Sequence, residues 1–166
     1  NRLLFADRLE QAVMRSERSR TSMALMLVDI DDFKLVNDSF GHDAGDKLIK
    51  AVGDLIAKSL RRADTIARLG GDEFAVIIEG IDGPQDAISI ADNLTTILEH
   101  NVRLDDQETY TSASIGIAVY PDDGKDARSL LKNADTAMFR AKENGRHCFQ
   151  FYKPEMSVSA MERLEL

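Results

Sequence analysis

One carboxylate of the sequence, Asp29, lies near the end of an apolar run that extends from Met23 to Ile30. An uninterrupted apolar run of this length predicts a strand that is buried on both faces, so Asp29 should lie at the end of a core strand. A lone carboxylate in that position is costly unless it is paired, hydrogen-bonded or bound to a metal ion. Asp31 and Asp32 follow at once and could simply cap the next helix. Capping accounts for Asp32, but it leaves Asp29 unexplained.

A second group of carboxylates, Asp72 and Glu73, directly follows the glycine pair 70–71 and stands between apolar stretches at 65–69 and 74–78. Glycine readily adopts the positive φ that a two-residue hairpin turn requires, so the sequence predicts a hairpin with both carboxylates at its tip. An ordinary solvated turn has the same composition. A tip held by two strands can also present charge to a ligand at a fixed position.

Composition limits the kind of protein and its partners. With 166 residues, 43% hydrophobic and 30% charged, the chain fits one globular domain. The 21 basic and 29 acidic residues give a net charge of -8, which favours neither nucleic acid nor an anionic membrane as a partner. The sequence has neither an apolar run of membrane-spanning length nor a secretory signal, and one cysteine, Cys148, cannot form an internal disulfide. We therefore expect a cytoplasmic domain.

The elements that must position these carboxylates follow from periodicity and turn signals. In chain order the pattern predicts helices over 1–19, around 33–36 and over 48–60, the hairpin, a helix over 87–98, a second hairpin with arms 102–104 and 109–120, a helix over 130–141 and a strand over 147–152. This order predicts an α+β fold, in which helices pack on an open, mainly antiparallel sheet.

Two strings of residues resemble a known family. The string from Arg68 to Phe74 is similar to the signature of the GGDEF family, the diguanylate cyclases that make cyclic di-GMP from two GTP molecules. The stretch from Asp29 to Asp46 meets every fixed position of a further family pattern, Asp-x-Asp-x-Phe-Lys-x-x-Asn-Asp-x-x-Gly-His-x-x-Gly-Asp. The resemblance implies a palm-like, ferredoxin-related nucleotidyl cyclase fold for residues 1–152. Residues 153–166 resemble a linker to an EAL-type phosphodiesterase domain.

The same resemblance assigns a metal site. It implies that Asp29, Asp72 and the Ile30 carbonyl hold Mg²⁺ or Mn²⁺, since hard cations prefer oxygen ligands and such ions draw together the hydroxyl and the phosphate. It places Glu73 at the same cluster and gives Asp72 and Glu73 the catalytic roles. Either Asp72 or a metal-bound hydroxide could take the proton of the attacking hydroxyl.

Substrate binding is also assigned by resemblance. Guanine presents two neighbouring donors, which suits the Asp46 carboxylate with Asn37 beside it. Backbone N–H groups at 30–33 can hold phosphate oxygens, although Lys142 and Arg146 could equally complement the dipole of their helix. The residues implied in substrate binding are Phe33, Lys34, Asn37, Asp46, Gly71, Lys142 and Arg146.

The implied reaction is attack by the 3'-hydroxyl of one GTP on the α-phosphate of another, with pyrophosphate released. One domain holds one GTP, so a transient homodimer is expected. Arg61 and Asp64 fall where many family members carry a product-inhibition motif for cyclic di-GMP, although basic residues also favour the last turn of a helix. The alternative function is a regulatory module that binds GTP and controls an attached EAL phosphodiesterase. A purely structural domain is a third interpretation.

Overall fold

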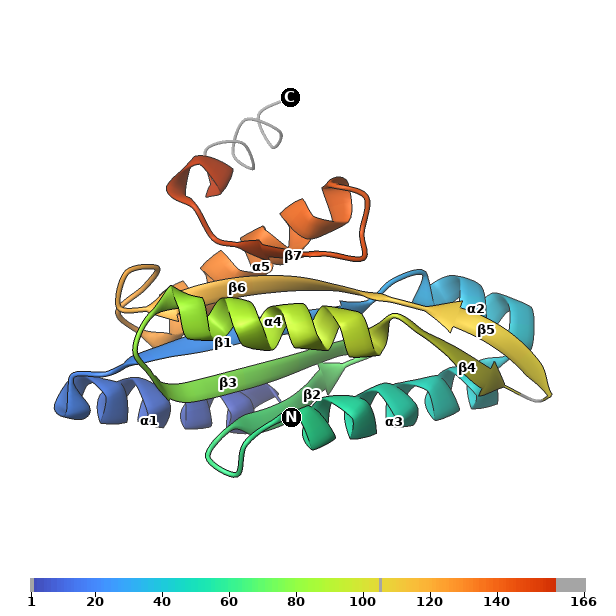
Figure 1. Ribbon diagram of the computed structural model, residues 1–166, viewed down its shortest axis with the longest axis horizontal. Helices are drawn as coiled ribbons and strands as arrows, with labels where there is room; N and C mark the ends of the chain where they lie inside the picture. Colours follow the sequence, from blue (N-terminus) through green and yellow to red (C-terminus); the bar gives the residue numbers. More distant parts are fainter. Residues whose placement is uncertain (1, 105, 158–166) are drawn as a thin grey trace.

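The protein is built around a central strand with a partner on each side, as the computed structural model shows for residues 2–104 and 106–157 (Figure 1). β1 (Ser22–Ile30) pairs antiparallel with β3 (Glu73–Ile81) and with β6 (Ala113–Tyr120). β2 (Thr65–Gly70) lies outside β3, and β7 (Phe149–Phe151) runs parallel to β6 at the other edge. The predicted α+β fold with a mainly antiparallel sheet is confirmed.

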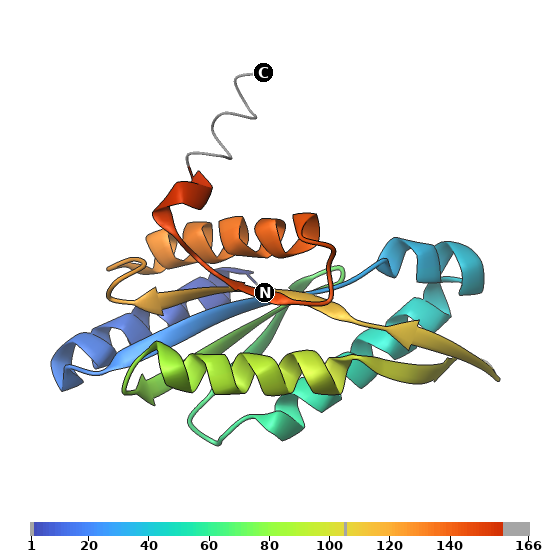
Figure 2. The ribbon, with the colours of Figure 1, turned by 45° about the horizontal axis from the view of Figure 1, so that its top comes forward.

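Helices cover both faces of this sheet, which explains the uninterrupted apolar run of β1. The helices are α1 (Arg2–Ser19), α2 (Phe33–Phe40), α3 (His42–Ser59), α4 (Pro84–Leu98) and α5 (Ala127–Glu143). Alternate β1 residues such as Met26 and Val28 pack in the core with α3 and α4, whereas Leu25 and Leu27 pack in the core with α1 and α5. Figure 2 shows α5 and α4 on opposite sides of the sheet. No helix in the described ranges is long and apolar enough to cross a membrane.

The first predicted hairpin is confirmed. β2 and β3 are joined at Gly71, which has a φ of 50°. The guanidinium of Arg68 closes the turn, because its Nη2 donates to the Gly71 carbonyl at 2.9 Å. The turn therefore needs a glycine for its conformation and an arginine to hold it.

The second predicted hairpin was wrong in one respect, because its long arm over 109–120 is two strands. β4 (His100–Leu104) and β5 (Gln107–Thr111) form a separate two-stranded sheet, and β6 begins only at Ala113. Between them the Ser112 carbonyl accepts a hydrogen bond from the Asp31 backbone N–H at 2.9 Å. The chain thus passes from one sheet to the other at Ser112.

The last predicted strand, 147–152, is shorter in the structure. β7 starts at Phe149 because Arg146 and His147 have φ values of 64° and 47°, which are incompatible with an extended strand. Met156, beyond the strand, is buried. Residues 158–166, most of the predicted linker, lie outside the described residues, and the boundary at 152 stays a prediction.

The close contact between α5 and β6 predicts how a substitution at Gly116 changes the stability of the fold. A Cβ atom on Gly116 would lie 2.2 Å from both the Ala134 carbonyl oxygen and the Met138 nitrogen, which are backbone atoms of α5. Gly116→Ala must push the helix away, so we expect it to lower the free energy of unfolding by at least about 1–3 kcal/mol. Gly83→Ala is the matched control, because Gly83 has an extended φ of 170° and open space at its Cβ position. Equal transition temperatures for the two variants would contradict this packing.

Candidate active site

The acidic cluster is assembled by strand pairing. Asp29 is the penultimate residue of β1 and lies directly opposite Glu73 of β3. The Ile30 backbone N–H donates to the Asp72 carbonyl at 3.1 Å. The end of β1 and the tip of the β2–β3 hairpin are therefore fixed against each other, which brings together three carboxylates from distant parts of the sequence.

Within this cluster, the pKa of the Asp29 carboxyl is the most strongly shifted. Its residue surface is 6% exposed, and the Lys142 ammonium lies 2.5 Å from its Oδ2. Burial raises the pKa of Asp29 to about 7, and the Asp72 carboxylate adds to the rise, while Lys142 opposes it. The other oxygen, Oδ1, is buried and has no hydrogen-bond partner among the residues that the structure describes. In the described residues, one Asp29 oxygen thus has a hydrogen-bond partner and the other has none.

The cluster fits a divalent cation with additional ligands. A buried, unpartnered Oδ1 of Asp29 beside the Asp72 carboxylate would be stabilised by positive charge. Within the described ranges no three His, Cys, Asp or Glu side chains form a metal site by themselves. A cation here would therefore draw on oxygens other than side-chain carboxylates, such as the Ile30 carbonyl and the phosphates of a ligand.

Glu73 lies at the same edge but is paired differently. It forms an ion pair with Arg2 of α1, with Nη2 and Oε2 3.8 Å apart. Burial raises the pKa of Glu73, and Arg2 partly offsets the rise. The half-buried Glu73 side chain is thus held between α1 and the cluster.

Two cations from the end of α5 face the turn between β1 and α2. Lys142 reaches Asp29, and the Arg146 Nε lies 3.9 Å from Asp32 Oδ1. Asp32 occupies the N-cap position of α2 with a left-handed φ of 55°, yet its side chain makes no capping hydrogen bond. The predicted N-cap position of Asp32 is therefore confirmed, but its backbone carbonyl and not its carboxylate bonds the first turn of the helix. Because the first N–H groups of a helix lack intrahelical partners, this turn can accept an anion.

The predicted base site lies between α2 and α3. The Asn37 Oδ1 is buried, finds no hydrogen-bond partner in the described part of the chain, and lies only 1.8 Å from where a Cβ on Gly45 would be. Phe33 also contacts this position, with its Cζ at 3.1 Å. Asp46 follows on the exposed surface of α3. Asn37, Phe33 and the start of α3 are thus brought together, whereas the Lys34 side chain is exposed.

Comparison with known proteins identifies the architecture. A family model described as "Diguanylate cyclase, GGDEF domain" matches residues 1–148. The chain belongs to the GGDEF domain family. The bifunctional diguanylate cyclase/cyclic di-GMP phosphodiesterase MucR of Pseudomonas aeruginosa is 43% identical over 166 residues, which are 100% of this chain and 24% of MucR.

Solved GGDEF domains share the fold. The GGDEF domain of TpbB (YfiN) from Pseudomonas aeruginosa has a TM-score of 0.90 and 38% identity, covering 92% of this chain and 96% of that one. The GGDEF domain of DgcB from Caulobacter crescentus, solved in complex with c-di-GMP, has a TM-score of 0.83 and 26% identity, covering 89% and 87%. The chain spans only 21 to 34% of the length of three curated relatives that it matches.

Arg61 and Asp64 of this GGDEF domain lie away from the acidic cluster. They precede β2, whose first residue pairs with Ile77 at the opposite end of the hairpin from its tip. The Asp64 side chain is 1% exposed and accepts from the Arg61 Nη2 at 3.1 Å, while the Arg61 side chain is 55% exposed. The same Nη2 donates to the Glu79 carbonyl at 2.8 Å. The pair is thus preformed and presents a guanidinium to solvent.

Sequence reasoning missed the role of Asp31. Its carboxylate is buried and accepts hydrogen bonds from the hydroxyls of Ser112 and Ser114. The one sequence signal was its place directly after a buried strand, which capping seemed to explain. The serines are 81 and 83 residues away, so no local pattern could indicate the contact.

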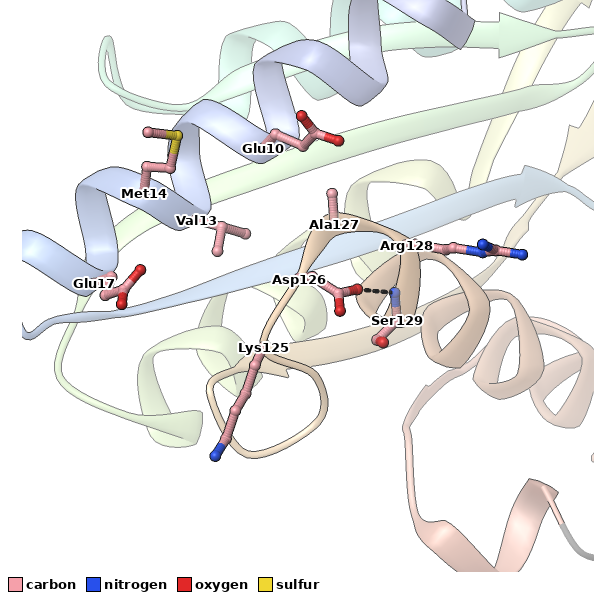
Figure 3. A pocket seen from close by; sticks show the side chains of 9 residues that line it. All are labelled: Glu10, Val13, Met14, Glu17, Lys125, Asp126, Ala127, Arg128 and Ser129. Atoms are coloured by element: carbon pink, nitrogen blue, oxygen red, sulfur yellow. Dashed lines mark hydrogen bonds between the residues drawn. The ribbon is translucent and has the colours of Figure 1, made fainter.

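A pocket of about 520 Å³ lies apart from these residues, between α1 and the start of α5 (Figure 3). Charges of both signs line it, including Glu10, Glu17, Lys125 and Arg128. Asp126, which also lines the pocket, caps α5 by accepting from the Ser129 N–H at 2.7 Å. None of the predicted site residues lines this pocket.

The contact between Gly45 and Asn37 gives a prediction for ligand binding. Gly45→Ala places a methyl group where the Asn37 amide lies, so the amide must move although alanine favours the helix. We expect guanine-nucleotide affinity to fall by about 1–3 kcal/mol, the cost of losing a buried polar contact. Titration calorimetry with GTP would measure it. Gly53→Ala on the same helix is the control, because its Cβ meets only the Phe74 ring, at 3.2 Å. Equal affinities of both variants would remove Asn37 from the base site.

Proposed function

We propose that this GGDEF domain is a diguanylate cyclase that condenses two GTP molecules into cyclic di-GMP and releases two pyrophosphates. The observation that carries the proposal is the juxtaposition of the Asp29 and Asp72 carboxylates with the Lys142 ammonium at one end of the sheet. Carboxylates next to a cationic side chain suit phosphoryl transfer, because charge must be balanced at the reacting phosphate. The names of its relatives agree with this chemistry.

Each part of the site then has a role. The buried Asn37 Oδ1 and the Asp46 carboxylate accept from the guanine edge, and the Phe33 ring closes the pocket. Lys142 and Arg146, together with the first N–H groups of α2, bind the triphosphate, and the exposed Lys34 adds a further cation. The exposed turn at Gly71 leaves space beside the cluster.

A divalent cation, Mg²⁺ or Mn²⁺, would be held by Asp29, Asp72 and the Ile30 carbonyl, and when bound it would neutralise the phosphate and favour the attacking hydroxyl. Glu73 supports the cluster from the opposite strand. Asp72, half-buried beside Asp29, is the protein group that could receive the proton of the 3'-hydroxyl.

The stoichiometry requires two chains. One set of base and phosphate ligands binds one GTP, whereas the product contains two nucleotides, so two domains must face each other as a homodimer. The net charge of -8 opposes association, which makes a transient encounter the simplest arrangement. A cytoplasmic location, where GTP is available and Cys148 stays reduced, is part of the proposal.

The exposed Arg61 guanidinium, held by Asp64, is the proposed binding site for cyclic di-GMP as an inhibitor. It can pair with a phosphate or stack on a guanine, and its position at the far end of the β2–β3 hairpin leaves the substrate cleft free. Inhibition would then be noncompetitive with GTP.

A second candidate function is a GTP-binding regulatory module of a larger phosphodiesterase. The observation that favours it is the similarity to MucR, whose name includes a phosphodiesterase activity and of which this chain covers 24%. Turnover separates the two functions, because a purely regulatory module binds GTP without consuming it.

The central test is product formation. The purified chain incubated with GTP and Mg²⁺ should form cyclic di-GMP, and Asp72→Asn should abolish turnover while the fold is retained, because an amide is a weak ligand for a hard cation. Chromatographic detection of product and circular dichroism measure the two effects. Asp54→Asn, an exposed carboxylate on α3, is the control and should keep full activity. Near-parental activity of Asp72→Asn at saturating Mg²⁺ would refute the assignment.

The need for two chains to meet during catalysis gives a further prediction. Specific activity should rise with protein concentration in the dilute range, and fusion of a parallel dimeric coiled coil to the N-terminus should raise it strongly and remove the dependence. Initial rates over a dilution series, with the oligomeric state measured by light scattering, test this expectation. Constant specific activity in a sample shown to be monomeric would overturn the two-chain mechanism.

A further inference from the structure

The Asp31 carboxylate accepts three hydrogen bonds, although the proposed function gives it no contact with the divalent cation or the guanine base. The residue is 7% exposed. Its Oδ1 accepts from the Ser114 hydroxyl at 2.6 Å, and its Oδ2 accepts from the Ser112 hydroxyl at 2.7 Å and from the His147 backbone N–H at 3.0 Å. The carboxylate therefore joins the end of β1, the start of β6 and the turn after α5.

The third of these contacts reaches a turn with an unusual backbone. Arg146 and His147 are consecutive non-glycine residues with φ values of 64° and 47°, a region that side chains with a Cβ rarely adopt. The Arg146 N–H is held at 3.1 Å by the Ala141 carbonyl. The His147 N–H is held by Asp31, a residue 116 positions earlier in the chain. Without the Asp31 carboxylate, the His147 N–H loses this hydrogen bond and the left-handed conformation of His147 is less restrained.

The position of this turn matters because of the residues around it. Lys142 and Arg146 belong to the segment that Asp31 holds, and they meet Asp29 and Asp32, the residues two before and one after Asp31. One carboxylate thus links the segment that carries Lys142 and Arg146 to the turn between β1 and α2.

We propose that Asp31 is a positioning residue for phosphate binding: by accepting the His147 N–H it fixes the α5–β7 turn so that Lys142 and Arg146 face the triphosphate. The inference rests on the proposed function of the site. Asp31 takes no part in proton transfer or metal binding, and the serines serve to orient its carboxylate.

The direction in which triphosphate affinity changes on substitution of Asp31 distinguishes a positioning role from a purely electrostatic one. Removal of a negative charge near a triphosphate site should strengthen the binding of an anion. Loss of the position of two cations should weaken it. A substitution that eliminates the Asp31 carboxylate therefore gives opposite results under the two explanations.

The test compares nucleotides that differ only in phosphate number. We would measure affinities for 3'-deoxy-GTP, which lacks the attacking hydroxyl and cannot react, and for 3'-deoxy-GMP, in the presence of Mg²⁺. Asp31→Ala should reduce the preference for the triphosphate about tenfold, the loss expected for a charged contact, while affinity for the monophosphate changes little. Asp31→Asn should keep most of the preference, because its carbonyl oxygen can still accept from the His147 N–H and its amide can donate to Ser114.

Asp123→Ala provides the matched control for general destabilisation. Asp123 is a half-buried carboxylate that accepts from the Val119 N–H at 2.9 Å and holds the loop at the opposite end of α5. It should lower thermal stability without changing the triphosphate preference. If Asp31→Ala does not fold, Asp31→Ser replaces it, because it keeps a polar side chain at this position but lacks the Oδ2 atom that accepts from the His147 N–H.

Hydrogen exchange provides a readout that needs no nucleotide. The His147 amide should exchange faster in Asp31→Ala, and near parental rates in Asp31→Asn. An unchanged or increased triphosphate preference in folded Asp31→Ala, or unchanged exchange at His147, would overturn the proposal. A parent chain without any triphosphate preference would count against the proposed function instead, and the exchange rates would still decide whether Asp31 holds the turn.

Discussion

The buried carboxylate of Asp29 is the constraint on which the site depends. Strand pairing in the sheet places it opposite Glu73 and beside Asp72, and the Lys142 ammonium pairs with it. Burial of charge without full compensation destabilises a fold, so the rest of the structure must hold these groups in place. The helices on both faces of β1 supply that rigidity, because they bury nearly every residue of the strand.

The local features of this architecture could be predicted from the sequence, because they depend on residues close together in the chain. The apolar run of β1 and the glycine pair before Asp72 gave the strand and the hairpin correctly. The palm-like fold came from resemblance, and comparison with solved GGDEF domains confirms it. Helical periodicity likewise located α1 and α5.

The features that sequence reasoning missed depend on distant residues or on backbone conformations without a glycine signal. Asp31 was interpreted as part of a cap because its serine partners are more than eighty residues away. The left-handed pair Arg146 and His147 follows Gly145, and only the glycine marked a turn. The transition between sheets at Ser112 was also missed, because the residues on both sides of it favour strands and no turn signal separates them.

The site is made of two parts that differ in how firmly the fold holds them. The acidic part lies on β1, in the middle of the sheet, where backbone groups are paired on both sides. The cationic part lies beside a surface turn next to the short edge strand β7. Opening of that edge costs less free energy than opening of the centre, so the two halves should have different lifetimes under native conditions. The site would then open first at Lys142 and Arg146, while the acidic cluster persists until the whole domain unfolds.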